Sequence, residues 1–312
     1  MKLSVILPCF NGAETILVQL EALTRQRSRH AWEVVVVNNG STDLSMEIVA
    51  AYDGRLPGLR IVDAHQDSGP QRGVTHSYAV GFAAASGDAF LLCEADDEVG
   101  EGWLATLGDA LAEHELVAAA LEYDRLNPEH VRPKEWKQQS VEAGLSTISG
   151  PTHWPYASGC SLGLRRSVYE RLGDPDERCA ASWDTDYCWR ARLAGIELVF
   201  VPQATVHYRM RTTLQGAYKQ GRSWGAGHVV LEDKYAAPLP TRFAVVKREL
   251  RYVRDLARHF AKLAKVAARE QPLGSWLWGL GWCVATVEGG KLHWQALARQ
   301  PGRDVNRHPA TT

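Results

Sequence analysis

The sequence predicts an α/β fold: an open, mostly parallel sheet covered by helices on both faces, followed by a helical C-terminal extension. Over about the first 120 residues, short apolar or β-branched runs alternate with segments of helical pattern. The runs lack the polar alternation of half-exposed strands, which favours strands buried on both faces by crossover helices. Polar, turn-forming residues follow three of the runs, and ligands of such sheets bind beyond the carboxyl ends of the strands.

The elements of this sheet follow in order along the chain. Five apolar runs are the expected strands, at Leu3–Leu7, Val34–Val37, Leu59–Val62, Ala89–Cys93 and Leu116–Leu121. The segments between them are the expected helices, at Ala13–Arg25, Leu44–Tyr52, Gln71–Ala85 and Gly102–Glu113. Helical connections of this kind join parallel strands.

The second half of the chain is less regular. The polar segment from Asn127 to Pro155 is rich in Pro, Lys, Gln and Ser and is expected to be a loop or an insertion. Further expected elements are a strand at Ser158–Leu164, a helix at Asp184–Ala194, a strand at Glu197–Val201 and a loop at Gln203–Arg211. Beyond Phe243 the pattern becomes helical and basic, and the tail from Pro301 is expected to be disordered.

Composition limits the class of protein. The 312 residues are 45% hydrophobic and 23% charged, which permits a large core. The formal net charge of -1 argues against a nucleic-acid binder driven by overall positive charge. The six cysteines form no CxxC pair, which predicts reduced, buried thiols in a cytosolic protein. We expect neither a secretory signal nor a transmembrane helix.

Three carboxylates lie within four residues after the fourth expected strand, in Glu94-Ala95-Asp96-Asp97. Clustered carboxylates repel one another unless a cation lies among them. One interpretation is a Mg²⁺ or Mn²⁺ ion held by one or two carboxylates and by substrate phosphates. The alternative is a solvated acidic turn at the start of a helix.

Two further polar segments suggest binding or catalysis. Asn38–Asp43 follows a run of four valines and either presents amide and carboxylate groups to a nucleobase or forms a turn with a helix cap. Within Trp183–Arg190, Asp184 is expected near a helix N-terminus, where it either deprotonates an acceptor hydroxyl or is an ordinary cap. Asp186 and Arg190 have the spacing of an i,i+4 ion pair.

A single histidine follows the last expected strand. His207 lies just past the strand, within Ala204–Arg209. A lone histidine is usually structural. In this position it could instead add a nitrogen ligand to a metal held by Glu94, Asp96 and Asp97.

Taken in this order, the motifs resemble the inverting glycosyltransferases of family 2, which have the GT-A fold, a Rossmann-like sheet flanked by helices. The resemblance spans about Leu3 to Trp224, and the order of motifs is more specific than any one of them. The matching segments are Ser4–Asn11, Val34–Asp43, Gly81–Asp88 leading into Glu94–Glu98, Trp183–Arg190, Ala194-Gly195 and Val201-Pro202, with His207 beyond.

The resemblance implies roles for the matching positions. Donor binding is implied for Pro8, Phe10, Glu14, Asn39, Asp63, Arg72 and Asp96. Metal binding, at the place of the family's DxD motif and its late ligand, is implied for Glu94, Asp96, Asp97 and His207. Asp184 resembles the catalytic base. Gln220 and Trp224 match a Gln-x-x-Arg-Trp acceptor motif in which Ser223 replaces the arginine.

Besides Ser223, three places depart from the family pattern. Glu94 stands where the first aspartate of DxD is usual and is longer by one methylene. The segment Ser77–Gly81 replaces Ala-Arg-Asn-x-Gly, so the arginine that often contacts donor phosphates is missing, with Arg72 or His76 as expected substitutes. Trp183 stands where a glutamate usually precedes the base.

The function implied is a metal-dependent inverting glycosyltransferase that uses Mg²⁺ or Mn²⁺ and a nucleotide-diphosphate sugar, with UDP or dTDP favoured. Its acceptor is a glycan, lipid-linked or other hydroxyl, in cell-surface polysaccharide or glycolipid assembly. A non-catalytic nucleotide-sugar-binding scaffold is one alternative, supported by Glu94 and by the missing arginine. A sugar nucleotidyltransferase is disfavoured because the turn after the first strand lacks a glycine-rich, basic phosphate loop.

The expected domains are a catalytic domain at 1–225, with a donor half at about 1–125 and an acceptor half at about 126–225, a helical extension at 226–300 and a disordered tail at 301–312. The extension is basic and carries Trp276, Trp278 and Trp282. It either caps the catalytic domain or contacts the anionic headgroups of a membrane. The expected location is the cytoplasm, with the inner face of the plasma membrane as a candidate.

Overall fold

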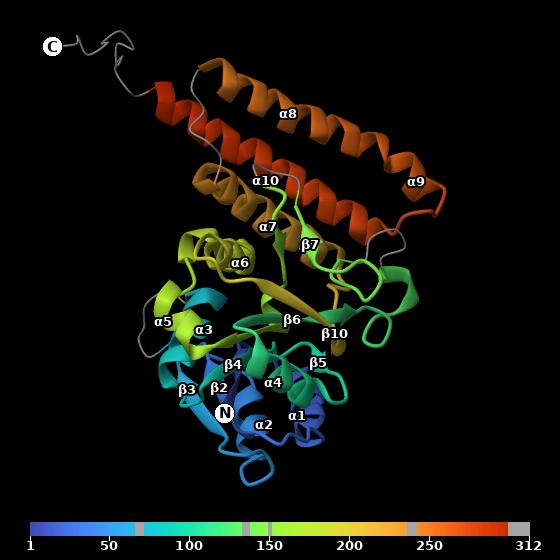
Figure 1. Cartoon of the computed structure of the whole chain (residues 1–312). Coiled ribbons are helices and arrows are strands. Elements are labelled where there is room, and N and C mark those ends of the chain that lie inside the picture. The colour runs from blue at the N-terminus through green and yellow to red at the C-terminus, as the bar shows by residue number, and fades with distance from the viewer. Residues whose placement is uncertain (66–71, 133–137, 149–151, 236–241, 299–312) are drawn as a thin grey trace, which may run out of the picture.

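The computed structural model describes residues 1–65, 72–132, 138–148, 152–235 and 242–298. One sheet contains eight strands in the order β3-β2-β1-β4-β9-β6-β10-β5 (Figure 1). Its strands are β1 (Lys2–Cys9), β2 (Ala31–Asn38), β3 (Arg60–Asp63), β4 (Ala89–Leu92), β5 (Glu98–Val99), β6 (Leu116–Glu122), β9 (Leu162–Arg165) and β10 (Leu198–His207). A separate two-stranded sheet pairs β7 (Ser146–Thr147) with β8 (Pro155–Tyr156). The expected disordered tail at 301–312 lies outside the described residues.

The helices are α1 (Ile16–Thr24), α2 (Ser45–Ala50), α3 (Val74–Ala84), α4 (Trp103–Glu113), α5 (Arg166–Leu172), α6 (Trp183–Leu193), α7 (Leu214–Tyr235), α8 (Arg242–Ala261), α9 (Leu263–Ala267) and α10 (Leu273–Ala298). The 3₁₀ turns are η1 (Glu129–Val131), η2 (Gly159–Ser161) and η3 (Glu177–Ser182). Each strand and helix expected in the first 120 residues is confirmed, with ends shifted by a few residues. Gln71, the expected start of the third helix, lies outside the described residues.

The sheet is mostly parallel, as predicted. Parallel pairs join β1 to β2 and β4, β2 to β3, and β6 to β10. β9 lies antiparallel between β4 and β6, and β5 is antiparallel to β10. Two local predictions are wrong: the strand expected at Ser158–Leu164 begins as a 3₁₀ turn, and β10 continues through the expected loop to His207. β10 continues because its second half pairs with β6 after a register shift between Val201 and Thr205.

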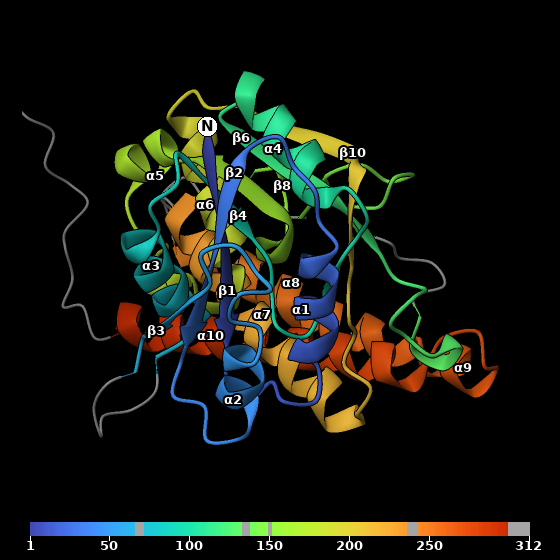
Figure 2. The same cartoon turned by 90° about the horizontal axis from the view of Figure 1, so that it is seen from below.

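Helices cover both faces because side chains of the central strands alternate between them. In β1, Val5 and Leu7 belong to a core with residues of α1, α2 and α4. Ile6 belongs to the opposite core, with residues of α3, α5 and α6. Figure 2 shows α1 and α3 on opposite sides of β1 and β2. This arrangement leaves the carboxyl edge of the parallel strands open to ligands.

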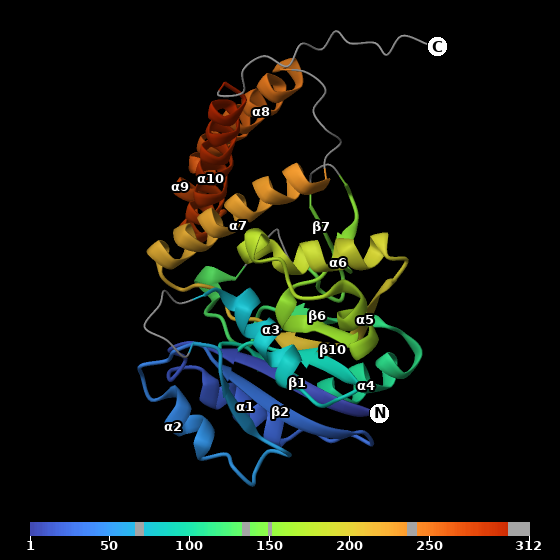
Figure 3. The same cartoon turned by 90° about the vertical axis from the view of Figure 1, so that its left-hand side faces the viewer.

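The C-terminal helices form a layer of their own. α7 lies next to the sheet domain, and α10 packs against both α7 and α8 (Figures 1 and 3). The part of α7 before residue 226 was not predicted. The helix runs without interruption across residue 225, so the expected boundary between 1–225 and 226–300 lies inside a helix. Within the described part of the chain, none of the helices combines the length and apolar character needed to cross a bilayer.

Glycines allow α7 and α10 to approach closely. A Cβ on Gly221 would lie 1.9 Å from the backbone oxygen of Trp278, and a Cβ on Gly281 would lie 2.3 Å from the backbone oxygen of Tyr218. Contacts below 3.0 Å do not occur at real Cβ atoms, so these two positions require glycine at the present helix separation. The helices therefore meet backbone to backbone along this glycine seam.

The three tryptophans of the C-terminal extension pack against aromatic side chains of the C-terminal helices, as the helical-cap alternative expects. Trp276 is buried and stacks on His259, with ring centroids 5.2 Å apart. Trp278 stacks on Trp282 at 5.6 Å and meets Trp224 of α7 edge-on at 6.0 Å. Trp278 and Trp282 also contribute backbone atoms to the glycine seam, near Gly221 and Gly225.

Candidate active site

Three carboxylates meet in the turn after β4. Glu94, Asp96 and Asp97 each offer one oxygen, and these oxygens lie within 4.8 Å of one another. Asp97 is 1% exposed, and the other two are half-buried. The turn follows the carboxyl end of a parallel strand, where ligands of such sheets bind. The structure therefore brings together three of the four residues expected to bind metal.

Burial and mutual repulsion disfavour the charges of this cluster. Burial, with the neighbouring Asp96 carboxylate, raises the pKa of Glu94 to about 8. Burial also raises the pKa of Asp97 well above its usual range, and the charges of Asp96 and Glu94 add to that shift. A cation among the three side chains would relieve the repulsion and favour their ionised forms.

The donor atoms of the cluster fit a hard divalent cation, because carboxylate oxygens are the ligands that Mg²⁺ and Mn²⁺ prefer. Asp97 Oδ1 accepts a hydrogen bond from the backbone N–H of Arg209 at 2.8 Å. Asp97 Oδ2 is buried and has no hydrogen-bond partner among the described residues. A buried carboxylate oxygen without a partner is costly, so Asp97 has one oxygen suited to a metal.

Two arginines after β10 reach the same turn, and the sequence analysis assigned a role to neither. Arg211 Nη1 lies 2.8 Å from Asp96 Oδ2. Arg209 Nε donates a hydrogen bond to the backbone carbonyl of Asp96 at 2.7 Å. They add positive charge where Arg72 or His76 had been expected to do so. The available signal was the Arg-x-Arg spacing directly after a strand, which sets both side chains on one side of an extended chain.

A cavity of about 510 Å³ opens beside the carboxylate turn. Its lining includes most of the residues expected to bind a donor, namely Pro8, Phe10, Glu14, Asn39, Arg72 and Asp96. Glu94, Arg209 and Arg211 line it as well. These residues come chiefly from the turns after β1, β2 and β4, which are neighbours in the sheet. A cavity of this size suits a small molecule or cofactor.

Three of the residues expected to bind the donor have hydrogen-bond or ion-pair partners within the protein: Asn39, Arg72 and Asp63. Asn39 is buried, and its Nδ2 donates a hydrogen bond to the backbone carbonyl of Arg72 at 2.8 Å. The Arg72 side chain pairs with Glu177. Asp63 ends β3 and accepts a hydrogen bond from Asn38 Nδ2 at 2.8 Å. Asp63 is not among the described residues that line the cavity, so the structure places it beside the expected donor site.

Asp184 lies in the first turn of α6 and is 8% exposed. Its Oδ2 accepts a hydrogen bond from the N–H of Gly159 at 3.0 Å, and its Oδ1 accepts one from the N–H of Thr185 at 2.7 Å. Burial raises the pKa of Asp184 to about 6, although these hydrogen bonds favour the charged form. The charge of Asp184 in turn raises the pKa of Glu94, so the two carboxylates are near enough to interact.

His207 is not in the group of described residues suited to a metal at the carboxylate turn, and its role as a metal ligand stays a prediction. It is the last residue of β10 and pairs in register with Glu122 of β6. Its Nδ1 lies 2.7 Å from Glu122 Oε2. Because the neighbouring strand offers a carboxylate at the paired position, His207 has a structural partner there. The group of described residues suited to a metal at this turn holds carboxylates alone.

Residues 4–173 of the chain match the model of the family described as Glycosyl transferase family 2. Among curated proteins, the chain is similar to the uncharacterized glycosyltransferase YibD of Escherichia coli (strain K12), with 32% identity over 123 residues, which is 39% of this chain and 34% of YibD. The chain spans 25% to 61% of the length of the curated relatives that it matches.

Solved structures share the fold at low identity. The mannosyltransferase PcManGT from Pyrobaculum calidifontis, in complex with GDP-Man and Mn²⁺, matches with a TM-score of 0.61 and 19% identity, over 93% of this chain and 87% of that chain. Residues 1–349 of Staphylococcus aureus TarS, in complex with UDP, match with a TM-score of 0.51 and 18% identity, over 95% and 92%. These likenesses confirm the GT-A architecture that the sequence predicts.

Proposed function

The chain belongs to glycosyl transferase family 2, and on that premise we propose that it is an inverting, metal-dependent glycosyltransferase. It takes a hexosyl or related sugar from a nucleoside-diphosphate donor, with UDP or dTDP favoured, and transfers it to a hydroxyl of a glycan or lipid-linked acceptor. The complexes of PcManGT with GDP-Man and Mn²⁺ and of TarS with UDP support such a donor and a divalent metal. A poly-beta-1,6-N-acetyl-D-glucosamine synthase among the curated relatives supports a role in cell-surface polysaccharide or glycolipid assembly.

One arrangement carries the proposal. A group of three carboxylates, Glu94, Asp96 and Asp97, borders a cavity of about 510 Å³ at the carboxyl edge of the sheet, and a fourth carboxylate, Asp184, is buried close to them. The cavity has room for a nucleotide, and the carboxylates suit a metal that binds a diphosphate. The buried fourth carboxylate suits a base, because it has no part in the metal cluster.

The cavity residues divide the work of binding the donor. Glu94, Asp96 and Asp97 would hold Mg²⁺ or Mn²⁺, which when bound supplies positive charge to a departing diphosphate. In the proposal, Arg211 adds positive charge near the diphosphate oxygens; its contact with Asp96 supports this role. Asn39, in the turn after β2, binds the nucleobase in the proposal, and its position in the cavity lining supports this role.

Asp184 acts as the base in this proposal. Its pKa of about 6 leaves the carboxylate mostly ionised at pH 7.5, and the N–H groups of Gly159 and Thr185 hold it in one orientation. The acceptor oxygen forms its bond to the anomeric carbon as the bond to the diphosphate breaks on the opposite face. The hydroxyl proton passes to Asp184. A single displacement of this kind inverts the anomeric configuration.

Calorimetric titration tests the donor site. UDP, dTDP and GDP are titrated, each with and without Mn²⁺, into the wild type and into the double variant Asp96→Asn with Asp97→Asn. We expect binding of a uridine or thymidine nucleotide that requires Mn²⁺ and weakens at least 100-fold in the double variant, because two charged metal ligands are lost. Asp53→Asn, at an exposed aspartate after α2, is the control and should bind as the wild type does.

Two results would count against the donor site. Nucleotide binding that is independent of Mn²⁺, or equal in the double variant, would contradict the metal role of the carboxylates. A folded wild-type chain that binds none of the three nucleotides would favour the non-catalytic scaffold. Circular dichroism melts of each variant separate loss of binding from loss of folding.

The proposal includes a peripheral contact between α8 and an anionic membrane surface. On the outer side of α8, Leu250, Val253 and Phe260 are 63%, 53% and 47% exposed. Their spacing sets them on one helix face, and Lys247 and Arg254 are exposed beside them. An apolar face with basic flanks is typical of helices that lie in the membrane interface. This face supports the proposed membrane contact.

A further inference from the structure

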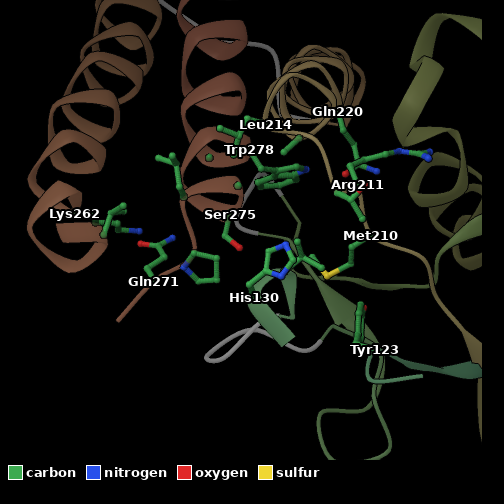
Figure 4. A pocket seen from close by; sticks show the side chains of 18 of the residues that line it. Tyr123, His130, Met210, Arg211, Leu214, Gln220, Lys262, Gln271, Ser275 and Trp278 are labelled. Carbon is green, nitrogen blue, oxygen red and sulfur yellow. The ribbon is translucent and has the colours of Figure 1, made fainter. Parts of the chain in front are cut away.

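A second cavity, of about 780 Å³, lies between the sheet domain and the C-terminal helices. Its walls come from the end of β6, the segment after β10, α7, α9 and the start of α10. Figure 4 shows Trp278 in the middle of these walls, with Arg211 and Gln220 on one side and Lys262 and Gln271 on the other. The donor site described above makes no use of this space.

One arginine that is paired with the carboxylate cluster also lines the second cavity. Arg211 lines both cavities, and its guanidinium is paired with Asp96. Ser158 also lines the second cavity, and the next residue, Gly159, donates its N–H to Asp184. Arg211 and the Ser158-Gly159 turn therefore link the second cavity to the carboxylate cluster and to Asp184, which is not itself among the described residues that line either cavity.

The chemistry of the second cavity changes from one side to the other. On the helical side, Lys262, Lys265 and Arg269 line it, and Glu270 is the acidic residue among the described lining residues. Toward the sheet and α7 the walls are largely aromatic, with Tyr123, Tyr208, Trp224 and Trp278. Grouped lysine and arginine side chains favour a phosphate, and aromatic rings favour the flat apolar faces of sugars or hydrocarbon.

Arg269 has a backbone conformation that favours glycine. Its φ is 59°, and it follows α9 as the left-handed residue of a helix end, where the N–H of Glu270 bonds the carbonyl of Lys265 at 2.9 Å. This position is usually glycine, because a Cβ is strained there. The side chain of Arg269 lines the cavity. Backbone strain of this kind is often found at ligand sites.

We propose that this cavity is the acceptor site and that it takes an anionic, phosphate-bearing acceptor. Lys262, Lys265 and Arg269 hold the phosphate, the aromatic walls hold the adjoining sugar or hydrocarbon, and the acceptor hydroxyl points past Arg211 to Asp184. This inference rests on the proposed function and deepens it. The phosphate comes either from a lipid headgroup or from a water-soluble phosphoester, and the two sources share the same chemistry at the lysines and Arg269.

Four probes that carry comparable hydroxyls test the site on the full chain. Glycerol 3-phosphate represents the water-soluble source, dihexanoyl-phosphatidylglycerol below its micelle concentration represents the lipid source, and glycerol and dihexanoylglycerol are their phosphate-free counterparts. Binding is followed by tryptophan fluorescence, because Trp224 and Trp278 line the cavity. The same samples are titrated with UDP and Mn²⁺, so that the donor site is measured independently.

Saturable binding of at least one phosphate probe, at least tenfold tighter than its phosphate-free counterpart, is the expected result. Lys262→Gln and Arg269→Gly should each weaken that binding about fivefold to tenfold, because each removes a charged partner. Arg254→Gln, which removes an exposed arginine of α8 that is not among the cavity residues, should leave it unchanged. UDP binding should be the same in all of these variants.

Arg269→Gly separates a ligand role from a structural one. Glycine removes the strain at φ 59°, so this variant should melt at the same or a higher temperature than the wild type while it binds the phosphate probe more weakly. Equal affinity for the phosphate probes and their counterparts, or unchanged affinity in Arg269→Gly, would overturn the acceptor site. If UDP still binds with Mn²⁺ in that case, the proposed transferase stands and only this inference fails.

Discussion

Tyr78 and Trp183 replace an arginine and a glutamate of the family pattern, and in this chain they contact each other. Both side chains are buried, and their ring centroids lie 4.8 Å apart. A Cβ on Gly159 would lie 2.4 Å from the Trp183 ring, so the ring packs directly on the glycine whose N–H binds Asp184. The aromatic pair thus helps to position the proposed base. Arg211 supplies positive charge beside the carboxylates in place of the missing arginine.

Asp184→Asn is expected to lower kcat by about 10²- to 10⁴-fold, because it removes the proton acceptor at nearly constant volume. The affinity for UDP should stay within about twofold. In the wild type, kcat should fall about tenfold for each pH unit below about 6, because the carboxyl group is then protonated. Rates of sugar transfer between pH 4.5 and about pH 8, with calorimetry for UDP, measure both effects. Equal rates for Asp184→Asn and the wild type would exclude Asp184 as the base.

Asp184 should also make the stability of the fold decrease as the pH rises. Burial raises the folded-state pKa of Asp184 above its unfolded value, so its ionisation destabilises the fold as pH rises from about 4 to about 6. Asp184→Asn should remove this contribution. Asp186→Asn is the matched control: its side chain pairs with Arg190 and Lys234, so this variant should lose stability and keep most of its activity.

At the scale of elements, the glycine seam decides how the C-terminal helices dock. α7 and α10 approach closely at this seam, and residues of both helices line the second cavity. β10 has a comparable role on the other side, because its extension to His207 carries the chain directly to Arg209 and Arg211. The α7–α10 seam and β10 both connect the sheet domain to the C-terminal helices. The proposed acceptor site therefore depends on how these elements pack.

Gly221→Ala and Gly274→Ala make the same chemical change in two helices with opposite expected results. A Cβ at Gly221 would lie 1.9 Å from a backbone oxygen of α10, so the variant should lose about 1–3 kcal/mol of stability and melt at a lower temperature. At Gly274 no atom lies within 4 Å of the added Cβ, so that variant should be unchanged or gain up to about 1 kcal/mol. Calorimetric melts compare them, and equal melting temperatures would contradict the seam.

At the scale of the whole molecule, charge is divided unequally along the chain. Residues 242–269 contain nine lysines and arginines and two acidic residues, although the formal net charge of the chain is -1. The basic segment includes α8, which lies on the far side of α10 from the sheet (Figure 1), and α9, which lines the second cavity. This charge distribution supports the proposed orientation at an anionic surface, with α8 toward the lipid.

Leu250→Glu is expected to reduce binding to vesicles that contain about one third anionic lipid by at least tenfold. The change removes an apolar side chain from the α8 face and adds a negative charge. Leu193→Glu on α6 is the matched control, because Leu193 is 64% exposed and Leu250 is 63% exposed. Flotation of the full chain with vesicles measures both variants. If the two variants bind equally well, the α8 face is not the membrane contact.

Local patterns in the sequence determined the parallel sheet and the position of the carboxylate turn. Continuous apolar runs such as Val34–Val37 predict buried strands, and the intervening helical segments predict the parallel sheet, because these signals depend on neighbouring residues alone. Polar turns after the strands predict the donor edge, since strand ends in a parallel sheet share one side. Glu94, Asp96 and Asp97 are three residues of one turn, so their proximity followed from the chain itself.

Only the tertiary structure decided the contacts between distant segments. Glu122 lies 85 residues from His207 in the sequence, and the register of β6 with β10 brings the two together. Arg211 reaches Asp96 from 115 residues away and lines both cavities. Gly221 and Gly281 let α10 dock on α7, and both helices contribute walls to the second cavity. Such contacts depend on packing between elements, which periodicity along the chain does not encode.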